Sequence, residues 1–244
     1  MDEPDLTHCM TQTSLLPIIC DRNKPPPQTA DADCIAIQSS TERRFLCKST
    51  RRHRNLPATE WICASLARAV DIPVADWAVV QMEGESELMF GSIWEGGGQD
   101  WVAALPEVSN KNIFSDAFAL DLTVHNVDRN LGNYLYISLA GDIVAKLIDA
   151  SRAFIYHGLP IPPLPMDDES QTMCARPCWE MYHPYDKARA LEVAKKIKYL
   201  PLDWMTTTLD GMPSEWMDEG TREALDLWWL AERAERIEAV EHEL

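Results

Sequence analysis

Residues 125–133 read His-Asn-Val-Asp-Arg-Asn-Leu-Gly-Asn, and residues 147–154 read Leu-Ile-Asp-Ala-Ser-Arg-Ala-Phe. Three oxygen-bearing side chains stand out in these segments: Asp128, Asn133 five residues later, and Asp149. The residues between the two segments are β-prone runs around a Gly-Asp turn, which predicts a β-hairpin. Asn133 therefore begins this hairpin, and Asp149 follows its second strand.

This set of side chains suits phosphoryl transfer from ATP. The reaction needs a carboxylate to orient the acceptor hydroxyl and oxygen ligands to hold Mg²⁺ on the phosphates. Asp128 can supply the first group, and Asn133 with Asp149 can supply the second. An Asp-x4-Asn spacing taken alone is equally typical of a polar turn between a helix and a strand. The interpretation therefore depends on the rest of the chain.

The composition indicates a folded protein with a large core. The chain has 244 residues, of which 46% are hydrophobic, and nine of them are Trp. A disordered chain lacks this much apolar surface. With 22 Lys+Arg against 39 Asp+Glu, the formal net charge of −17 opposes binding of a nucleic acid over a broad face. The length predicts one large domain or two lobes.

The sequence gives no sign of export or of membrane insertion. The longest runs without charged residues, 6–20 and 153–166, are too polar or too rich in proline to span a bilayer. Residues 1–5 are acidic where a secretory signal is basic. Seven cysteines are an odd number and are best explained as reduced thiols. We therefore expect a cytoplasmic protein without a membrane partner.

The sequence pattern predicts a β-rich first part and a mainly helical second part. In the first part we expect strands at 34–37, 44–48, 79–82 and 88–90, and one helix at about 55–70. In the second part helical periodicity predicts helices at about 112–124, 185–199 and 217–242. A Gly-Gly-Gly run at 96–98 is a natural linker. The expected domains are therefore residues 1–97 and 98–244.

The second part carries further expectations about its core and its loops. Along the helix expected at 217–242, one face holds Leu227, Leu230, Ala234 and Ile237. The tryptophans expected in the core are Trp204, Trp216, Trp228 and Trp229. Residues 156–179 are predicted to be irregular, and a loop of this length is usually functional or mobile.

A lysine and a glutamate in the first part add to the phosphoryl-transfer set. Lys48 ends the second predicted strand, from which its ammonium can reach the α- and β-phosphates of a nucleotide. Glu60 lies in the first turns of the next predicted helix, and an ion pair with Lys48 would fix the lysine. Simpler explanations exist for both. Lys48 can be an ordinary lysine at the end of a hairpin, and Glu60 can be a surface charge near a helix N-terminus.

Taken together, these residues make the sequence resemble the HipA-like kinases, compact bacterial relatives of the protein and phosphoinositide kinases. Residues 126–133 resemble the family's Asn-x-Asp-Arg-x-x-x-Asn loop, and residues 147–154 resemble its Ile-Asp-x-Gly-x-Ala-Phe segment. Lys48, the helix that carries Glu60 and the Pro-Ser-Glu-Trp run at 213–216 support the resemblance. It spans about residues 34 to 243.

The resemblance implies a two-lobed α+β protein-kinase-like fold, with a small β-rich N-lobe that carries one helix and a mainly helical C-lobe. It implies ATP and Mg²⁺ between the lobes, Asp128 as catalytic base, and Asn133 and Asp149 as metal ligands. It places Lys48 on the phosphates with Glu60 as its partner. The implied activity is that of a protein serine/threonine kinase with a protein substrate. Some relatives are toxins, which implies a cognate regulatory or antitoxin protein as a further partner.

Two departures from the family pattern leave a catalytically weak or inactive kinase open. Ala150 and Ser151 follow Asp149 where kinases carry a glycine. No glycine precedes Gly84, so a phosphate-covering loop at 21–32 would rely on proline and polar residues. Such a pseudokinase would act as a protein-interaction module. A lipid or small-molecule kinase of the same fold is a third alternative, although the chain lacks a basic amphipathic helix as a membrane signal.

Two surface features have no place in the phosphoryl-transfer set. Residues 43–54 contain six cationic side chains, which predict either a contact for a phosphate or acidic partner, or simply a solvated surface. Ser170 and Thr172 lie in the proline-rich segment, where an activation loop is expected, and are candidate autophosphorylation sites.

Overall fold

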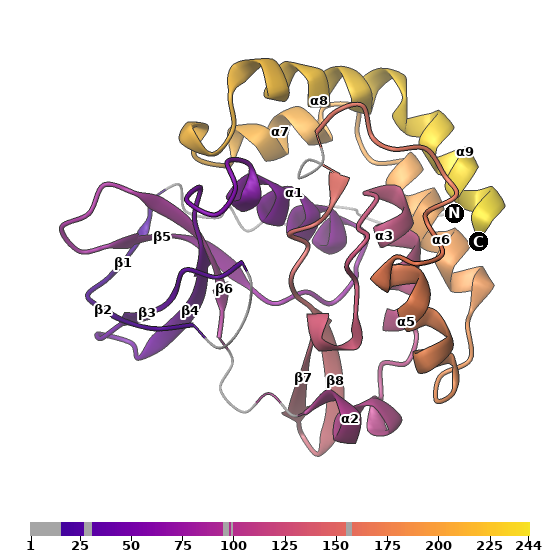
Figure 1. Cartoon of the computed structure of the whole chain (residues 1–244), viewed down its shortest axis with the longest axis horizontal. Coiled ribbons are helices and arrows are strands. Elements are labelled where there is room, and N and C mark those ends of the chain that lie inside the picture. Colours follow the sequence, from indigo (N-terminus) through magenta and orange to yellow (C-terminus); the bar gives the residue numbers. More distant parts are fainter. Residues whose placement is uncertain (1–15, 27–30, 95–97, 99, 155–157) are drawn as a thin grey trace, which may run out of the picture.

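The computed structural model describes residues 16–26, 31–94, 98, 100–154 and 158–244. It contains one six-stranded sheet, one two-stranded sheet and a group of helices, so the predicted α+β class is confirmed. Figure 1 shows the large sheet on one side of the molecule, the two-stranded hairpin in the middle and most helices on the other side. The predicted domain boundary at 97/98 adjoins residues 95–97 and 99, which lie outside the described residues, and it stays a prediction.

The six-stranded sheet is formed entirely by residues 18–93. Its strands are β1 (Ile18–Cys20), β2 (Arg22–Lys24), β3 (Cys34–Gln38), β4 (Arg43–Lys48), β5 (Trp77–Met82) and β6 (Leu88–Ile93), in the order β1-β5-β6-β4-β3-β2. All neighbours are antiparallel except β1 and β5. The predicted strand pairs β3–β4 and β5–β6 are confirmed. Lys48 lies at the end of β4, opposite Phe90 of β6.

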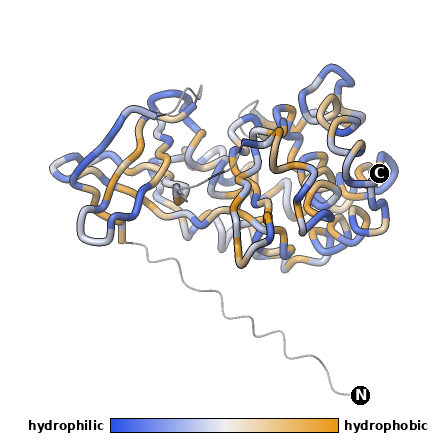
Figure 2. Tube along the Cα trace, turned by 90° about the horizontal axis from the view of Figure 1, so that it is seen from below, coloured by the Kyte–Doolittle hydropathy of each residue, from blue (hydrophilic) through white to orange (hydrophobic). Residues whose placement is uncertain are grey.

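Gly91 in β6 shows how closely this sheet is packed. An added Cβ at this position would lie 2.4 Å from Cγ2 of Val80 and 3.1 Å from Cβ of Phe45. Only a residue without a side chain fits between these two neighbours. Figure 2 shows the apolar runs along the strands and in the interior of the molecule, with hydrophilic segments at the outer loops.

Helix α1 (Leu56–Ala69) connects the sheet to the helical part. Pro57 lies in its first turn, where proline is tolerated, and the side chain of Asn55, the residue before the helix, forms no cap hydrogen bond. Trp61 packs edge-on against Trp77 of the sheet and against Trp216, and its Nε1 donates to the carbonyl oxygen of Thr208 at 3.0 Å. The helix is therefore buried on both sides, and Glu60 is buried with it.

The helical part contains α2 (Trp101–Ala104), α3 (Ile113–Thr123), α5 (Gln171–Glu180), α6 (Lys187–Lys198), α7 (Trp204–Asp210), α8 (Glu219–Ala231) and α9 (Arg233–Glu243). Helix α3 is buried along its whole length and packs against α6 and α9. The predicted helices at 112–124 and 185–199 are confirmed. None of the helices within the described ranges is long and apolar enough to cross a membrane.

The helix predicted at 217–242 is in fact two helices with a break at Glu232, and of the four residues expected on one face only Ile237 is buried. Leu227 and Leu230 are 66% and 56% exposed, whereas Trp228 and Trp229 are buried, as predicted for the tryptophans. The indole rings are larger and bury more apolar area than leucine, so they take the inward positions.

The segment predicted to be irregular at 156–179 also differs from expectation, because its second half is helix α5. Ser170 caps this helix by accepting a hydrogen bond from the backbone N–H of Met173. Residues 158–170 contain no helix or strand, and residues 156–157 lie outside the described residues. The cap explains why a helix begins at Gln171 despite the prolines that precede it.

The predicted hairpin is confirmed as β7 (Tyr134–Leu139) and β8 (Asp142–Leu147), joined through Ala140 and Gly141, which both have positive φ. Leu147 also pairs with the chain between α1 and β5. Its N–H donates to the carbonyl oxygen of Pro73 at 2.8 Å, and its carbonyl accepts from the N–H of Ala75 at 3.0 Å. These bonds bring the residues after β8, including Asp149, next to α1 and the large sheet.

Candidate active site

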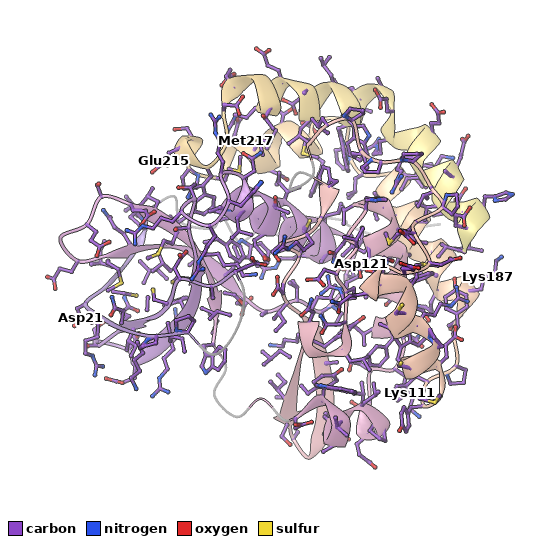
Figure 3. All side chains as sticks on the ribbon, in the orientation of Figure 1. Asp21, Lys111, Asp121, Lys187, Glu215 and Met217 are labelled. Carbon is purple, nitrogen blue, oxygen red and sulfur yellow. The ribbon has the colours of Figure 1, made fainter. Side chains whose placement is uncertain are left out.

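The loop between α3 and β7 is held by a buried ion pair. The guanidinium of Arg129 donates twice to Asp121 of α3, from Nε at 2.8 Å and from Nη2 at 3.1 Å. Nη1 of Arg129 donates to the carbonyl oxygens of Asn133, Ile148 and Asp149. Figure 3 shows Asp121 in the interior of the helical part. One arginine thereby fixes the start of the hairpin and the residues that follow it.

Asp128 and Asn133 lie at the two ends of a closed turn. Nδ2 of Asn133 donates to the backbone carbonyl oxygen of Asp128 at 2.8 Å. Because this bond uses the amide nitrogen, the Oδ1 atom of Asn133 keeps its capacity to accept or to bind a cation. Within the turn, the N–H of Gly132 donates to Oδ1 of Asn130 at 2.9 Å. The sequence-predicted pair is therefore brought together.

Thr172 at the start of α5 supports the same loop from the other side. Its Oγ1 donates to the carbonyl oxygen of Asn126 at 2.5 Å and accepts from the N–H of Arg129 at 3.0 Å. These two bonds bracket Asp128. Thr172 is only 2% exposed, so the hypothesis of autophosphorylation at its hydroxyl is wrong for the described conformation. Ser170 is half-buried, and phosphorylation at this residue stays a hypothesis.

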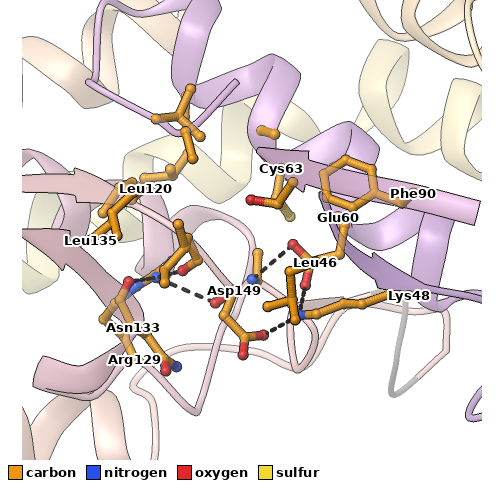
Figure 4. A pocket seen from close by; sticks show the side chains of 18 of the residues that line it. Leu46, Lys48, Glu60, Cys63, Phe90, Leu120, Arg129, Asn133, Leu135 and Asp149 are labelled. Atoms are coloured by element: carbon orange, nitrogen blue, oxygen red, sulfur yellow. Dashed lines mark hydrogen bonds and ion pairs between the residues drawn. The ribbon is translucent and has the colours of Figure 1, made fainter. Parts of the chain in front are cut away.

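Lys48, Glu60 and Asp149 form a buried cluster, shown in Figure 4. Nζ of Lys48 lies 2.5 Å from Oε1 of Glu60 and 2.7 Å from Oδ1 of Asp149. The side chains of Lys48 and Glu60 are each 5% exposed, and that of Asp149 is 27% exposed. The ion pair predicted between Lys48 and Glu60 is thus present, and neither residue has the simpler surface role.

The turn after Asp149 explains why no glycine is needed there. Asp149 has a φ of 57°, in the left-handed region that Asp tolerates better than most residues, whereas Ala150 is not among the described residues with positive φ. The N–H of Ala150 donates to Oε2 of Glu60 at 3.2 Å, and the N–H of Ser151 donates to Oδ1 of Asp149 at 3.3 Å. The unusual backbone conformation therefore belongs to the aspartate itself.

Burial and charge shift the pKa values of the cluster. Burial opposes ionisation of Asp149, but the charge of Lys48 and the hydrogen bonds from Lys48 and Ser151 outweigh it, so its pKa lies well below the usual range. Burial raises the pKa of Glu60 despite Lys48. For Lys48, burial is outweighed by Asp149 and Glu60, which hold its pKa above the usual range. Lys48 and Asp149 are therefore both charged at neutral pH.

The pKa of Asp128 is raised, first by burial and then by the negative charge of Asp149. A carboxyl group with a raised pKa is a stronger base in its ionised form. Asp128 is half-buried. The other predicted site residues, Lys48, Glu60, Asn133 and Asp149, all line the cavity described next. Asp128 is not among the residues that line it, so of the predicted site residues it alone lies outside the cavity wall.

The cluster lies in a cavity of about 230 Å³ between the large sheet and the hairpin. Apolar side chains come from the sheet on one side, including Leu46 and Phe90, and from the hairpin on the other, including Leu135 and Leu147. Its polar part includes Lys48, Glu60, Asn133 and Asp149, together with the ion pair of Asp121 and Arg129. An apolar slot with charged groups at one end suits a ligand with a flat apolar part and an anionic part.

The connection between β2 and β3 reaches this region through Asp31. Its Oδ2 accepts from Oγ of Ser151 at 2.8 Å, and its Oδ1 lies 3.4 Å from Nη2 of Arg152. The connection belongs to the segment 21–32, which the sequence suggested as a phosphate-covering loop. Its residues 27–30 lie outside the described residues, so that suggestion stays a prediction.

The cationic residues at 43–54 do not form one open patch. Lys48 is inside the cluster, and three arginines lie near carboxylates: Arg51 with Glu87 at 2.5 Å, Arg52 with Asp33 at 3.6 Å and Arg54 with Asp218 at 3.6 Å. Arg43 and Arg44 are exposed. Much of the local positive charge is balanced within the chain, which favours the solvated-surface alternative.

Two contributors to the site were missed by sequence reasoning. One is the pair of Arg129 and Asp121, and the other is Thr172 as a support of the loop. A signal for the first was available, because Asp116 and Asp121 interrupt an otherwise apolar helix, and a buried carboxylate needs a partner. No such signal marked Thr172, whose partners are backbone atoms 43 and 46 residues away.

The chain is similar to known proteins at the level of structure. No protein-family model and no curated protein sequence matches the chain. Among solved structures, the chain is similar to the proinflammatory kinase CtkA of Helicobacter pylori, with a TM-score of 0.60, 12% identity, and coverage of 93% of this chain and 98% of that chain.

A second similar structure is HipA of Shewanella oneidensis MR-1, from a toxin–antitoxin complex with HipB and operator DNA. The TM-score is 0.52 and the identity 12%, with coverage of 82% of this chain and 60% of that chain. The chain thus spans about 60% of the length of that HipA. Together the two structures confirm the resemblance to the HipA-like kinases at the level of the fold.

Proposed function

We propose that the chain is an ATP-dependent phosphotransferase, a HipA-like kinase that phosphorylates Ser or Thr hydroxyls on a protein. In this proposal residues 1–97 are a small N-lobe, residues 98–244 are a helical C-lobe, and ATP with Mg²⁺ binds between them. The observation that supports it best is the cluster of Lys48, Glu60 and Asp149 at the polar end of an apolar cavity. Kinases use a lysine fixed by a glutamate to hold phosphates, and a nearby aspartate to hold metal.

The cavity has apolar groups for the base of a nucleotide and a charged group for its phosphates. Its apolar walls, from the sheet and from the hairpin, suit the faces of a purine ring. Lys48 supplies a permanent positive charge for the phosphates, because its pKa is held high by Asp149 and Glu60 in spite of burial. Glu60 keeps the ammonium in place and also accepts the N–H of Ala150.

The residues present fit a magnesium ion. Asn133, through Oδ1, and Asp149, through its carboxylate, offer hard oxygen ligands, and both residues line the cavity. Among the described residues, no three His, Cys, Asp or Glu side chains gather into a metal cage. Magnesium suits such a site, because it is usually held by one or two protein ligands together with substrate phosphates and water. When bound, it would neutralise charge on the phosphates.

Asp128 is the proposed base. Its carboxylate would accept the proton of the acceptor hydroxyl while the hydroxyl oxygen forms a bond to the γ-phosphorus. The bond from that phosphorus to the β–γ bridging oxygen breaks, and ADP leaves. The raised pKa of Asp128 supports this role. Arg129 and Thr172 hold the loop on both sides of it.

The test is transfer of the γ-phosphate from labelled ATP with Mg²⁺, to the protein itself and to a cytosolic extract. We expect Asp128→Asn to lower the transfer rate about 10²- to 10⁴-fold, the usual contribution of a general base. Asp149→Ala should abolish transfer and weaken the thermal shift caused by ATP and Mg²⁺. Asp142→Asn is the matched control, because Asp142 is an exposed aspartate at the start of β8.

The same experiment separates the proposal from its alternative. A thermal shift with ATP and Mg²⁺ but no transfer would identify a nucleotide-binding pseudokinase that acts through protein contacts. The absence of both the thermal shift and the transfer would contradict the kinase and the pseudokinase alike. A cognate regulatory protein is a further expected partner, since the similar HipA was solved in complex with HipB. Co-purification of the chain with a neighbouring-gene product would test it.

A further inference from the structure

A second cavity, of about 580 Å³, lies beside the loop that carries Asp128. Its lining residues come from the start of α2, from the loop and from α5, and are Trp101, Asn130, Leu131, Gly132, Gln171, Cys174, Ala175 and Cys178. We call it the α5 groove. Gly132 lines both this groove and the cavity proposed for ATP, so the two adjoin at this residue. Asn130, which also lines the groove, follows Asp128 by two residues, so the groove adjoins the loop that carries the proposed base.

The surface of the groove is mainly apolar and open to solvent. Trp101 is 41% exposed, an unusual exposure for a tryptophan, and Leu131 and Ala175 lie with it. Gln171, Cys174 and Cys178 are exposed residues of α5 that also line the groove. Partly exposed aromatic side chains in a groove commonly anchor a side chain of a protein partner.

Acidic residues adjoin two of the segments that line the groove. The sequence Asp167-Asp168-Glu169 is exposed immediately before α5, and Sγ of Cys174 donates to the carbonyl oxygen of Asp168 at 3.5 Å. Asp100, which is exposed, precedes Trp101 and caps α2. Within a chain of net charge −17, these carboxylates make the groove attractive to positively charged segments.

From these observations we propose that the α5 groove binds the segment of the protein substrate that flanks the phosphorylated Ser or Thr, and that it selects a segment with Lys or Arg residues and one large apolar side chain. The apolar side chain would contact Trp101 and Leu131, and the basic residues would face Asp100 and residues 167–169. This inference rests on the proposed kinase function, because the bound segment is assigned as a substrate only if Asp128, on the adjoining loop, is the catalytic base.

The first test measures binding, so it does not depend on catalysis. Fluorescein-labelled peptides of about ten residues with a central Ser would be titrated by anisotropy, comparing a Lys/Arg- and Leu-containing peptide with an acidic one. We expect the basic peptide to bind more tightly, and Trp101→Ala to weaken its binding about tenfold. Asp168→Lys should weaken it as well. The matched control is Glu223→Lys, the same kind of charge reversal at an exposed glutamate of α8.

Thiol modification provides a second measurement on the unchanged chain. N-ethylmaleimide should react with the exposed Cys174 and Cys178 and thereby block peptide binding, while the thermal shift with ATP and Mg²⁺ is kept. A Cys174→Ser/Cys178→Ser variant should bind the peptide normally and resist the block. Mass spectrometry of the modified peptides would verify where the reagent reacted.

The outcomes distinguish the inference from the proposed function. If peptide binding is unchanged in Trp101→Ala, or the acidic peptide binds as well as the basic one, the groove inference is wrong even where ATP is turned over. If Trp101→Ala instead converts a dimer to a monomer in size-exclusion chromatography, a second copy of the chain covers the groove and the inference is equally wrong. Loss of any response to ATP, with basic-peptide binding intact, would contradict the kinase function and the substrate role of the bound segment, while the groove would remain a binding site for basic peptides.

Discussion

Two buried ion clusters meet at Asp149, and they differ in what they leave available. Arg129 and Asp121 form a closed pair, in which the guanidinium also bonds three backbone carbonyls, one of them that of Asp149. Lys48 with Glu60 holds the side chain of the same Asp149. All five residues line the cavity, but the carboxylate side chain of Asp149 is 27% exposed there, whereas Arg129 and Asp121 are almost fully buried. The backbone of Asp149 is thus fixed by one cluster, while its carboxylate is presented by the other.

The first cluster is expected to have a structural role and the second a role in ligand binding. Side chains of the closed pair are almost fully buried, and their hydrogen-bonding atoms are used within the chain. The open cluster has a carboxylate that can exchange a lysine partner for a cation, and an ammonium that can exchange a carboxylate for a phosphate. We expect changes in the closed pair to act on stability, and changes in the open cluster to act on ligand binding.

The largest effect on stability is expected for Asp121→Ala. It leaves the buried guanidinium of Arg129 without its counter-charge, which costs about 3–5 kcal/mol in free energy of unfolding. Urea denaturation followed by tryptophan fluorescence would measure the loss. Asp116→Ala is the matched control on the same helix, because its partner Arg189 is 30% exposed and can be solvated. Equal losses in both variants would remove the distinction between a closed and an open pair.

A smaller loss of stability is expected for Thr172→Val, which removes the two hydrogen bonds that support the loop of the closed pair. The N–H of Arg129 and the carbonyl of Asn126 lose their partner, which costs about 1–3 kcal/mol in free energy of unfolding. The rate of phosphoryl transfer should fall while the thermal shift with ATP remains. Thr172→Ser should restore the rate, and its failure to do so would count against hydrogen bonding as the cause.

The open cluster should affect stability mainly through pH. An unfolded Asp has a pKa of about 3.8, and the pKa of Asp149 in the fold lies well below this value. The charged Asp149 therefore stabilises the fold fully at pH values above about 3.8, and this stabilisation is lost progressively as the pH falls from there toward the lowered pKa. Between about pH 5 and about pH 3, Asp149→Asn should therefore lose about 1–2 kcal/mol less unfolding free energy than the wild type. Asn also tolerates the positive φ at this position. If the wild type and Asp149→Asn lost the same free energy of unfolding over this pH range in urea titrations, the lowered pKa of Asp149 would be contradicted.

The smallest effect is expected where an ion pair is exposed. Arg51 is 64% exposed and pairs with Glu87 at the surface of the sheet. Arg51→Ala should change the free energy of unfolding by about 0.2–1 kcal/mol, since solvent screens such pairs. Differential scanning calorimetry at low and high salt would measure this. A loss as large as that of Asp121→Ala would show that exposure does not decide the strength of these pairs.

Strands β3 to β8, most of the helices and the grouping of the site residues could be predicted because they depend on local signals. The three-residue strand β2 was not among the expected strands. Lys48 and Glu60 lie twelve residues apart on a strand and the next helix, so their contact follows from the local topology. The two-stranded hairpin follows from its turn. The roles of Asp128, Asn133 and Asp149 in catalysis and metal binding stay predictions.

Other features could not be read from the pattern. Leu227 and Leu230 compete with Trp228 and Trp229 for the inward face, and periodicity alone gave no reason to prefer one pair, since the neighbours differ by about 100° around the helix. The positive φ at Asp149 was missed for a different reason. The sequence drew attention to the absent glycine at the next position, whereas the backbone conformation is set by contacts with residues far away in the chain.

The two backbone hydrogen bonds between Leu147 and residues 73–75 join the large sheet to the hairpin through the main chain. They tie the chain between α1 and β5 to the end of β8, two residues before Asp149. Because no side chain takes part in these two bonds, substitutions in the cavity leave this junction in place. We therefore expect the amide protons of Ala75 and Leu147 to exchange slowly with solvent, in the wild type and in the cavity variants alike.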